Sequence, residues 1–148
     1  MSFNYEIDYD SIDFREHPGK YRVGRGEQGV LLVEPYKSEI LPEWRFKTPD
    51  IAEESSDTIY HMYLQYKKEN DFVGMDMARK FLQMGYTRAR RYANYPGGKK
   101  YNDAGDINDR KIDEQKAESA AIFETKWKLV REDKDYLKLK KEHQRKYG

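Results

Sequence analysis

Apolar residues recur every three or four positions along two long stretches of the chain, and this spacing favours a mainly helical fold. The first stretch follows Thr48 and Pro49, which suit the N-cap and the first position of a helix. We therefore predict a helix to about Glu69. The second stretch predicts a long helix from Glu114 onward that buries one stripe, made of Ala117, Ala120, Phe123, Trp127 and Val130.

A further apolar segment begins after Asp71, whose side chain is suited to cap a helix. It carries Phe72, Val73, Met77, Ala78, Phe81, Leu82 and Met84 before Gly85. Glycine is unfavourable inside a helix, so Gly85 either ends this segment or interrupts it.

Two short β-prone runs, residues 21–23 and 30–33, are separated by a segment with three glycines. Gly24, Gly26 and Gly29 suit the positive φ angles of a hairpin connection. The spacing of these glycines also matches the Gly-x-Gly-x-x-Gly pattern of dinucleotide-binding loops. That pattern requires a helix after it, whereas a β-prone run follows here. We expect an α+β fold, a mainly helical single domain with a small N-terminal β-hairpin.

The length of 148 residues suits one hydrophobic core, so we expect a single domain over residues 1–148. Residues 133–148 are rich in lysine and are expected to form a projecting or fraying C-terminal helix. No cysteine is present, which excludes disulfides, thiolate zinc sites and cysteine catalysis. The chain also lacks a signal-peptide pattern and any apolar run near the roughly 20 residues of a membrane span, so we predict a cytoplasmic protein.

The net charge of +1 conceals a basic segment in the middle of the chain. Residues 79–101 contain seven Lys or Arg and no Asp or Glu. If residues 76–94 are helical, Lys80, Arg88 and Arg91 share one side, with Arg79 and Arg90 at its edge. Such a cationic side, continued by a flexible Gly97-Gly98 turn, is typical of contacts with phosphate backbones.

We therefore predict non-catalytic binding of nucleic acid or another polyanion, with tyrosines available to stack on unpaired bases. The predicted binding residues are Lys80, Arg88, Arg90, Arg91, Lys99, Lys100, Tyr95 and Tyr101. The alternative interpretation is structural: these cations pair with carboxylates of the same fold, and the tyrosines belong to the core.

Two other classes of function stay open. A hydrolytic enzyme would need Glu16, His17 and Glu27 to converge near the hairpin, although a surface network of ion pairs explains them more simply. A protein-interaction or homo-oligomeric module would use the apolar stripe at Ala120 and Trp127, or the lysine-rich C-terminus. No nucleophile motif is present, so we name no catalytic residue.

No metal or cofactor is expected from the sequence. His17, His61 and His143 lack ligand spacing. The acidic residues near the N-terminus, Glu6, Asp8 and Asp10, are better explained as a solvated edge than as a cation site.

Two blocks of sequence resemble a known family. The first runs from Asp13 through Arg22 to Pro49, and the second runs from Asp71 through Arg88 to Asn94. Both are similar to a domain-of-unknown-function family found in bacteria and tailed phages, including cyanophages. The resemblance covers most of the chain up to about Tyr101. It implies a bacterial or phage-infected cytoplasm and supplies no catalytic residue or ligand.

Overall fold

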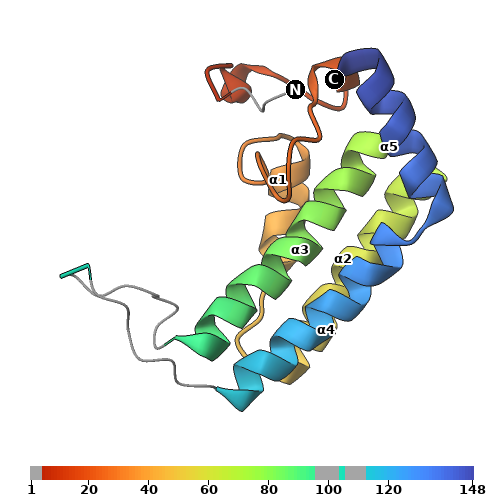
Figure 1. The fold of residues 1–148 in the computed structure, drawn as a ribbon. Helices are drawn as coiled ribbons and strands as arrows, with labels where there is room; N and C mark the ends of the chain where they lie inside the picture. Colours follow the sequence, from red (N-terminus) through yellow and green to blue (C-terminus); the bar gives the residue numbers. More distant parts are fainter. Residues whose placement is uncertain (1–4, 96–103, 106–112) are drawn as a thin grey trace.

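The computed structural model describes residues 5–95, 104–105 and 113–148. Within these residues every regular element is a helix (Figure 1). Three long helices, α2 (Pro49–Lys68), α3 (Phe72–Asn94) and α4 (Glu114–Arg131), pack against one another as a bundle. The fourth long helix, α5 (Lys134–Tyr147), follows α4 directly. The N-terminal segment holds one short helix, α1 (Tyr36–Ile40), and three single 3₁₀ turns, η1 (Tyr9–Ser11), η2 (Pro18–Lys20) and η3 (Leu41–Glu43).

The predicted starts of the bundle helices are confirmed. The hydroxyl of Thr48 accepts a hydrogen bond from the Ile51 amide at 3.3 Å, and the Asp71 carboxylate accepts one from the Gly74 amide at 3.1 Å. Each bond satisfies an amide that the first turn of a helix leaves without a partner. The stripe on α4 is also buried at Ala120, Phe123 and Val130, as its spacing predicts.

Gly85 neither ends nor interrupts its helix, because α3 continues for nine further residues to Asn94. The glycine instead lets α4 approach closely. A Cβ atom at position 85 would lie 2.3 Å from the ring of Phe123. The absence of a side chain there is therefore a packing requirement between α3 and α4.

The predicted β-hairpin is wrong, and the described part of the chain has an all-helical fold rather than an α+β one. Residues 25–32 form successive tight turns, in which the amides of Gln28, Val30 and Leu32 each donate to the carbonyl three residues earlier. The glycines do adopt positive φ, at 68°, 55° and 79° for Gly24, Gly26 and Gly29.

The reason for the error lies in what the backbone of this segment binds. The carbonyls of Gly26 and Gln28, in the segment predicted to connect the two strands, accept hydrogen bonds from the side chains of Arg79 and Lys80 on α3. Val30 and Val33, which would face opposite sides of a strand, are both buried in the core.

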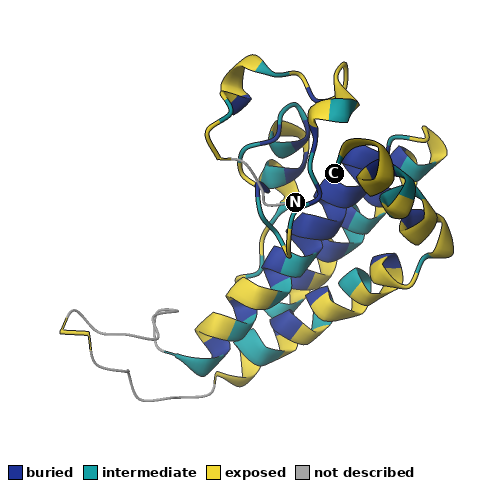
Figure 2. Cartoon of the chain, turned by 45° about the horizontal axis from the view of Figure 1, so that its top comes forward, coloured by how far each residue is buried: buried dark blue, intermediate teal, exposed yellow. Residues whose placement is uncertain are grey.

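The N-terminal segment and α5 together cover the first half of α3 (Figure 1). His143 on α5 donates from Nε2 to the carbonyl of Tyr21 at 2.7 Å, which ties the two covering segments to each other. Every residue of α3 from Phe72 to Leu82 is buried as a result. Figure 2 shows the change along the helix, from burial all round to one buried face.

Candidate nucleic-acid interface

The second half of α3 carries the basic residues that lie at the surface. Arg88 and Arg91 are exposed and Arg90 is half-buried. Within the part of the chain that the structure describes, none of the three makes an ion pair or a side-chain hydrogen bond. The opposite side of this half is held in the core by Gly85, Ala89 and Ala93. The surface arginines are therefore available to a ligand.

Lys80, which the sequence analysis placed with these arginines, lies elsewhere. Its side chain is completely buried, and its amino group donates to the carbonyl of Gln28 at 2.6 Å. The helical spacing does put Lys80 on the same side as Arg91, but the N-terminal segment covers that side along the first half of α3. Lys80 therefore has no place in a surface site.

The buried cations of α3 surround one carboxylate. Asp76 has no exposed surface, and its Oδ1 accepts from Tyr136 at 2.6 Å and from Arg79 at 2.8 Å and 3.0 Å. Its Oδ2 accepts a short hydrogen bond from the hydroxyl of Tyr21 and lies 3.9 Å from the Lys80 amino group. We call Tyr21, Asp76, Arg79, Lys80 and Tyr136 the buried polar cluster.

Burial and the neighbouring charges of the buried polar cluster shift the pKa values of Asp76 and Lys80. Burial raises the pKa of Asp76, but the positive charges of Arg79 and Lys80 outweigh this effect and hold the pKa at about 2. Burial lowers the pKa of Lys80 to about 7, although the Asp76 carboxylate opposes the change. The alternative structural interpretation of the basic segment, pairing inside the fold, therefore holds for Arg79 and Lys80 and not for Arg88 and Arg91.

The remaining predicted binding residues lie at or beyond the end of α3. Tyr95 follows the helix as its C-cap and is half-buried. Lys99, Lys100 and Tyr101 lie outside the described residues.

A groove beside the second half of α3 adds residues that the sequence analysis did not name as a site. It has a volume of about 370 Å³ and is lined by Arg45, Phe46, Lys47, Ile51, Tyr92 and Lys116. We call it the Phe46–Tyr92 groove. Three of the six lining residues are cationic and none is acidic. Tyr92 follows Arg88 by four residues, so the two side chains are neighbours on the helix surface.

The groove brings two aromatic rings together with cationic side chains. The rings of Phe46 and Tyr92 lie 5.9 Å apart at an angle of 45°, and Tyr92 is 40% exposed. The Lys116 amino group lies 5.9 Å from the centre of the Phe46 ring and donates to the carbonyl of Lys47 at 2.6 Å. The available signal in the sequence was the alternation Trp44-Arg45-Phe46-Lys47, which the sequence analysis passed over.

The residues suggested for catalysis do not meet in a pocket. Glu16 and His17 are both exposed, while the Glu27 carboxylate accepts from the Thr87 hydroxyl at 3.2 Å on the side of α3. None of the described cavities is lined by any of the three. The arrangement gives no support to a hydrolytic centre at these residues.

The apolar stripe on α4 is occupied within the chain. Ala120, Phe123 and Val130 are buried in the bundle core, and Trp127 is half-buried with its ring centre 5.7 Å from that of Tyr86. This stripe is therefore not an open docking surface.

Two searches of the described residues give negative findings. No helix among them has the length and apolar character needed to cross a bilayer. They also contain no group of three or more His, Asp or Glu side chains arranged to hold a metal ion.

Comparison with known proteins places the chain in a family. No curated protein and no solved structure matches it significantly. A family model described as a domain of unknown function, DUF4385, matches residues 4–146. Because this match spans nearly the whole sequence, the chain belongs to the DUF4385 family.

Proposed function

We propose that the protein binds nucleic acid without catalysing a reaction, through the second half of α3 and the Phe46–Tyr92 groove. The observation that carries the proposal is the junction of two exposed arginines, Arg88 and Arg91, which have no partner among the described residues, with a groove that two aromatic rings and no acidic residue line. Phosphates gain affinity from unpaired cations by counterion release, and aromatic rings give stacking surfaces for unpaired bases.

The arrangement favours single strands over duplex. In a duplex the bases are already stacked on one another, so the rings of Phe46 and Tyr92 would contribute little. In a single strand a base can insert beside Tyr92 while neighbouring phosphates lie along Arg88, Arg45 and Lys116. Lys99 and Lys100, four and five residues after Tyr95, are proposed to extend the same contact.

The test is fluorescence anisotropy of labelled single-stranded and duplex oligonucleotides over a series of salt concentrations. We expect single strands to bind more tightly, with affinity that falls as salt rises. Each lost phosphate contact should reduce the logarithmic salt slope by about 0.7 for single strands. The double variant Arg88→Glu and Arg91→Glu should abolish binding at moderate salt.

A matched control separates a specific surface from general charge. The double variant Lys68→Glu and Lys128→Glu makes the same change in net charge at exposed positions of α2 and α4. It should retain most of the affinity. Equal loss in both double variants, or no binding by the native protein at low salt, would overturn the proposal.

A further variant tests the aromatic part of the groove. Tyr92→Leu keeps an apolar side chain but removes the ring, so we expect a loss of about 1–3 kcal/mol in single-strand binding. Duplex binding should change little. A similar loss for both ligands would contradict base stacking at Tyr92.

The setting proposed for this function is the cytoplasm of a bacterium or of a phage-infected host, as the family resemblance implies. Both contain abundant single-stranded nucleic acid. Because the α4 stripe is buried, we do not propose it as a protein-interaction surface.

A further inference from the structure

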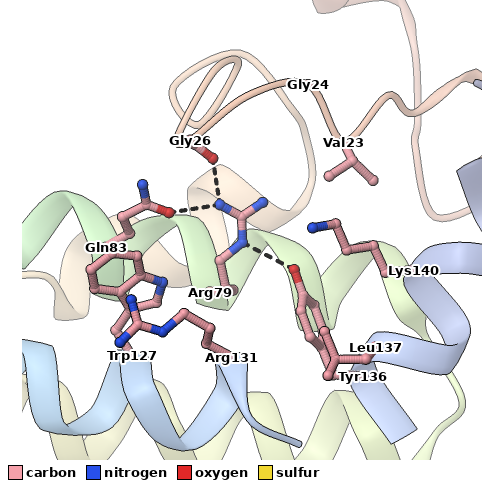
Figure 3. Close-up of a pocket in the computed structure, with 10 residues that line it drawn as sticks. All are labelled: Val23, Gly24, Gly26, Arg79, Gln83, Trp127, Arg131, Tyr136, Leu137 and Lys140. Atoms are coloured by element: carbon pink, nitrogen blue, oxygen red, sulfur yellow. Dashed lines mark hydrogen bonds between the residues drawn. The ribbon is translucent and has the colours of Figure 1, made fainter. Parts of the chain in front are cut away.

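A second pocket lies on the other part of α3, where the N-terminal segment, α4 and α5 meet (Figure 3). Its volume is about 230 Å³. The residues that matter for its chemistry are Arg79, Gln83, Trp127, Arg131, Tyr136 and Lys140. None of its lining residues belongs to the Phe46–Tyr92 groove, and none is acidic.

Arg79 forms the fixed wall of this pocket. Its guanidinium is held by the Asp76 carboxylate, the Tyr136 hydroxyl, the Gly26 carbonyl and the Gln83 side chain. A guanidinium carries five N–H groups. The hydrogen bonds from Arg79 use Nε–H, both hydrogens of Nη1 and one of Nη2, so one Nη2–H is left to donate.

Gln83 is oriented by the same network. Its side-chain oxygen accepts from Arg79 Nη1 at 2.8 Å, which fixes the amide and leaves its NH₂ group as a donor beside the pocket. The Tyr136 hydroxyl, by contrast, already donates to Asp76 and accepts from Arg79. The wall of the pocket therefore offers donors at Arg79 and Gln83 and no acidic acceptor.

Two further cations complete the pocket. Figure 3 shows the Lys140 amino group pointing toward the Arg79 guanidinium. Arg131 stacks on Trp127, with its guanidinium carbon 4.2 Å from the ring centre. Neither Lys140 nor Arg131 forms an ion pair with any residue that the structure describes. Three positively charged side chains therefore line one small pocket, and the Asp76 carboxylate that pairs with Arg79 already accepts hydrogen bonds at both oxygens.

We propose that this pocket binds a small phosphate anion, either inorganic phosphate or the terminal phosphate of a small phosphomonoester. Arg79 lies between Lys140 on one side and Gln83 and Arg131 on the other (Figure 3), and donors from these side chains bind the anion. A tetrahedral dianion suits donors that converge from several directions, and arginine is well matched to phosphate oxygens. The Trp127 ring supplies an apolar wall next to the bound group.

The experiment measures the melting temperature and the heat of binding of the full chain. The ligands are inorganic phosphate, adenosine monophosphate and adenosine, each at matched ionic strength in chloride. We expect a saturable rise in melting temperature with phosphate or with the monophosphate, and none with adenosine. Binding by phosphate alone identifies the free anion as the ligand, whereas tighter binding by the monophosphate identifies a phosphomonoester.

Two variants and one control test the residues without disturbing the core. Lys140→Gln removes one charge-assisted contact and should weaken binding roughly tenfold or more. Gln83→Glu keeps the acceptor for Arg79 but places a carboxylate at the pocket, so it should abolish phosphate binding. Lys141→Gln, an exposed neighbour on α5 that does not line the pocket, should bind like the native protein.

Three results would overturn the proposal: no saturable response beyond that of chloride, equal responses to adenosine and its monophosphate, or an unchanged response in Gln83→Glu. The double variant at Arg88 and Arg91 should keep the phosphate response, because those residues lie outside the pocket. The variants at Arg88 and Arg91 therefore test nucleic-acid binding, and those at Gln83 and Lys140 test phosphate binding, so one proposal can fail without the other.

Discussion

In the first half of α3, Arg79 and Lys80 lie inside the protein around Asp76, whereas in the second half Arg88 and Arg91 lie at the surface, with no carboxylate partner in the part of the chain that the structure describes. Basic residues in the first half of α3 thus take part in the core of the protein, whereas those in the second half present charge to solvent. The difference arises from what covers each half. The N-terminal segment and α5 cover the first half, and the second half extends past them.

The comparison shows that a run of basic residues is not by itself a binding surface. A cation that has a buried carboxylate beside it stabilises the fold, and removing either partner leaves an uncompensated charge. A cation without a partner changes stability little and is available to a ligand. Four measurements test this division of α3, and they follow in order of expected effect.

The largest effect is expected for Asp76→Asn. This change leaves Arg79 and Lys80 buried beside a neutral amide, and we expect a loss of about 3–5 kcal/mol in the free energy of unfolding. Urea denaturation at neutral pH measures it. The control is Asp57→Asn, which breaks a surface pair with Lys126 and should cost less than about 1 kcal/mol. Equal costs would contradict the assigned role of the buried polar cluster.

Lys80 should make stability depend on pH. Its pKa is about 7 in the folded protein and about 10.4 in an unfolded chain. Between these values the unfolded chain holds a proton that the folded chain lacks, so the free energy of unfolding rises with pH. The slope should approach about 1.4 kcal/mol per pH unit and vanish below about pH 7.

The check on Lys80 is a difference between proteins. Urea denaturation from about pH 7.5 to about pH 9.5 compares the native chain with Lys80→Met, and the remaining groups cancel in the comparison. Lys68→Met, at an exposed position on α2, should keep the native slope. A slope that persists in Lys80→Met would show that another group is responsible.

A smaller effect is expected at Gly85, near the boundary between the two halves. Alanine there would meet the Phe123 ring at 2.3 Å, and overpacking costs about 1–3 kcal/mol. The gain in helix propensity returns up to about 1 kcal/mol. We therefore expect Gly85→Ala to lower the free energy of unfolding, measured by urea denaturation, by a modest amount. The same substitution should cost less in a chain that already carries Phe123→Leu. An equal cost of Gly85→Ala in both backgrounds would mean that the close approach of α3 and α4 is not the cause.

The smallest effect is expected for Arg91→Gln in the second half. It should change the free energy of unfolding by less than about 0.5 kcal/mol, because the side chain has no partner to lose among residues 5–95, 104–105 and 113–148. Arg79→Gln, twelve residues earlier, should be severely destabilised. A large cost for Arg91→Gln would show that the two halves of α3 do not differ as described.

The helices were predictable because their signals are local. Thr48 and Asp71 cap helices through their own neighbours, and the α4 stripe needs only a regular spacing of apolar residues. The turns of residues 25–32, which take the place of the predicted hairpin, were not predictable in this way. Glycines and valines at residues 21–33 are compatible with both a hairpin and a series of turns, and the choice depends on Arg79 and Lys80, more than 45 residues away.

The candidate site was predictable only in part, for the same reason. Helical spacing placed Arg88 and Arg91 on one side with Arg90 at its edge, and in the structure Arg88 and Arg91 are exposed and Arg90 is half-buried. Helical spacing could not distinguish Lys80, since the segment that covers Lys80 is distant in the sequence. The groove partners Phe46 and Lys116 come from different parts of the chain, and no local pattern joins them.

The buried polar cluster has a consequence for the order of folding. Asp76 is linked to the hydroxyl of Tyr21, 55 residues earlier, and to that of Tyr136, 60 residues later. Closing two such loops costs chain entropy before any hydrogen bond is gained. We therefore expect α2 and α3 to associate first and the cluster to close after the rate-limiting step. Its interactions would then slow unfolding far more than they speed folding.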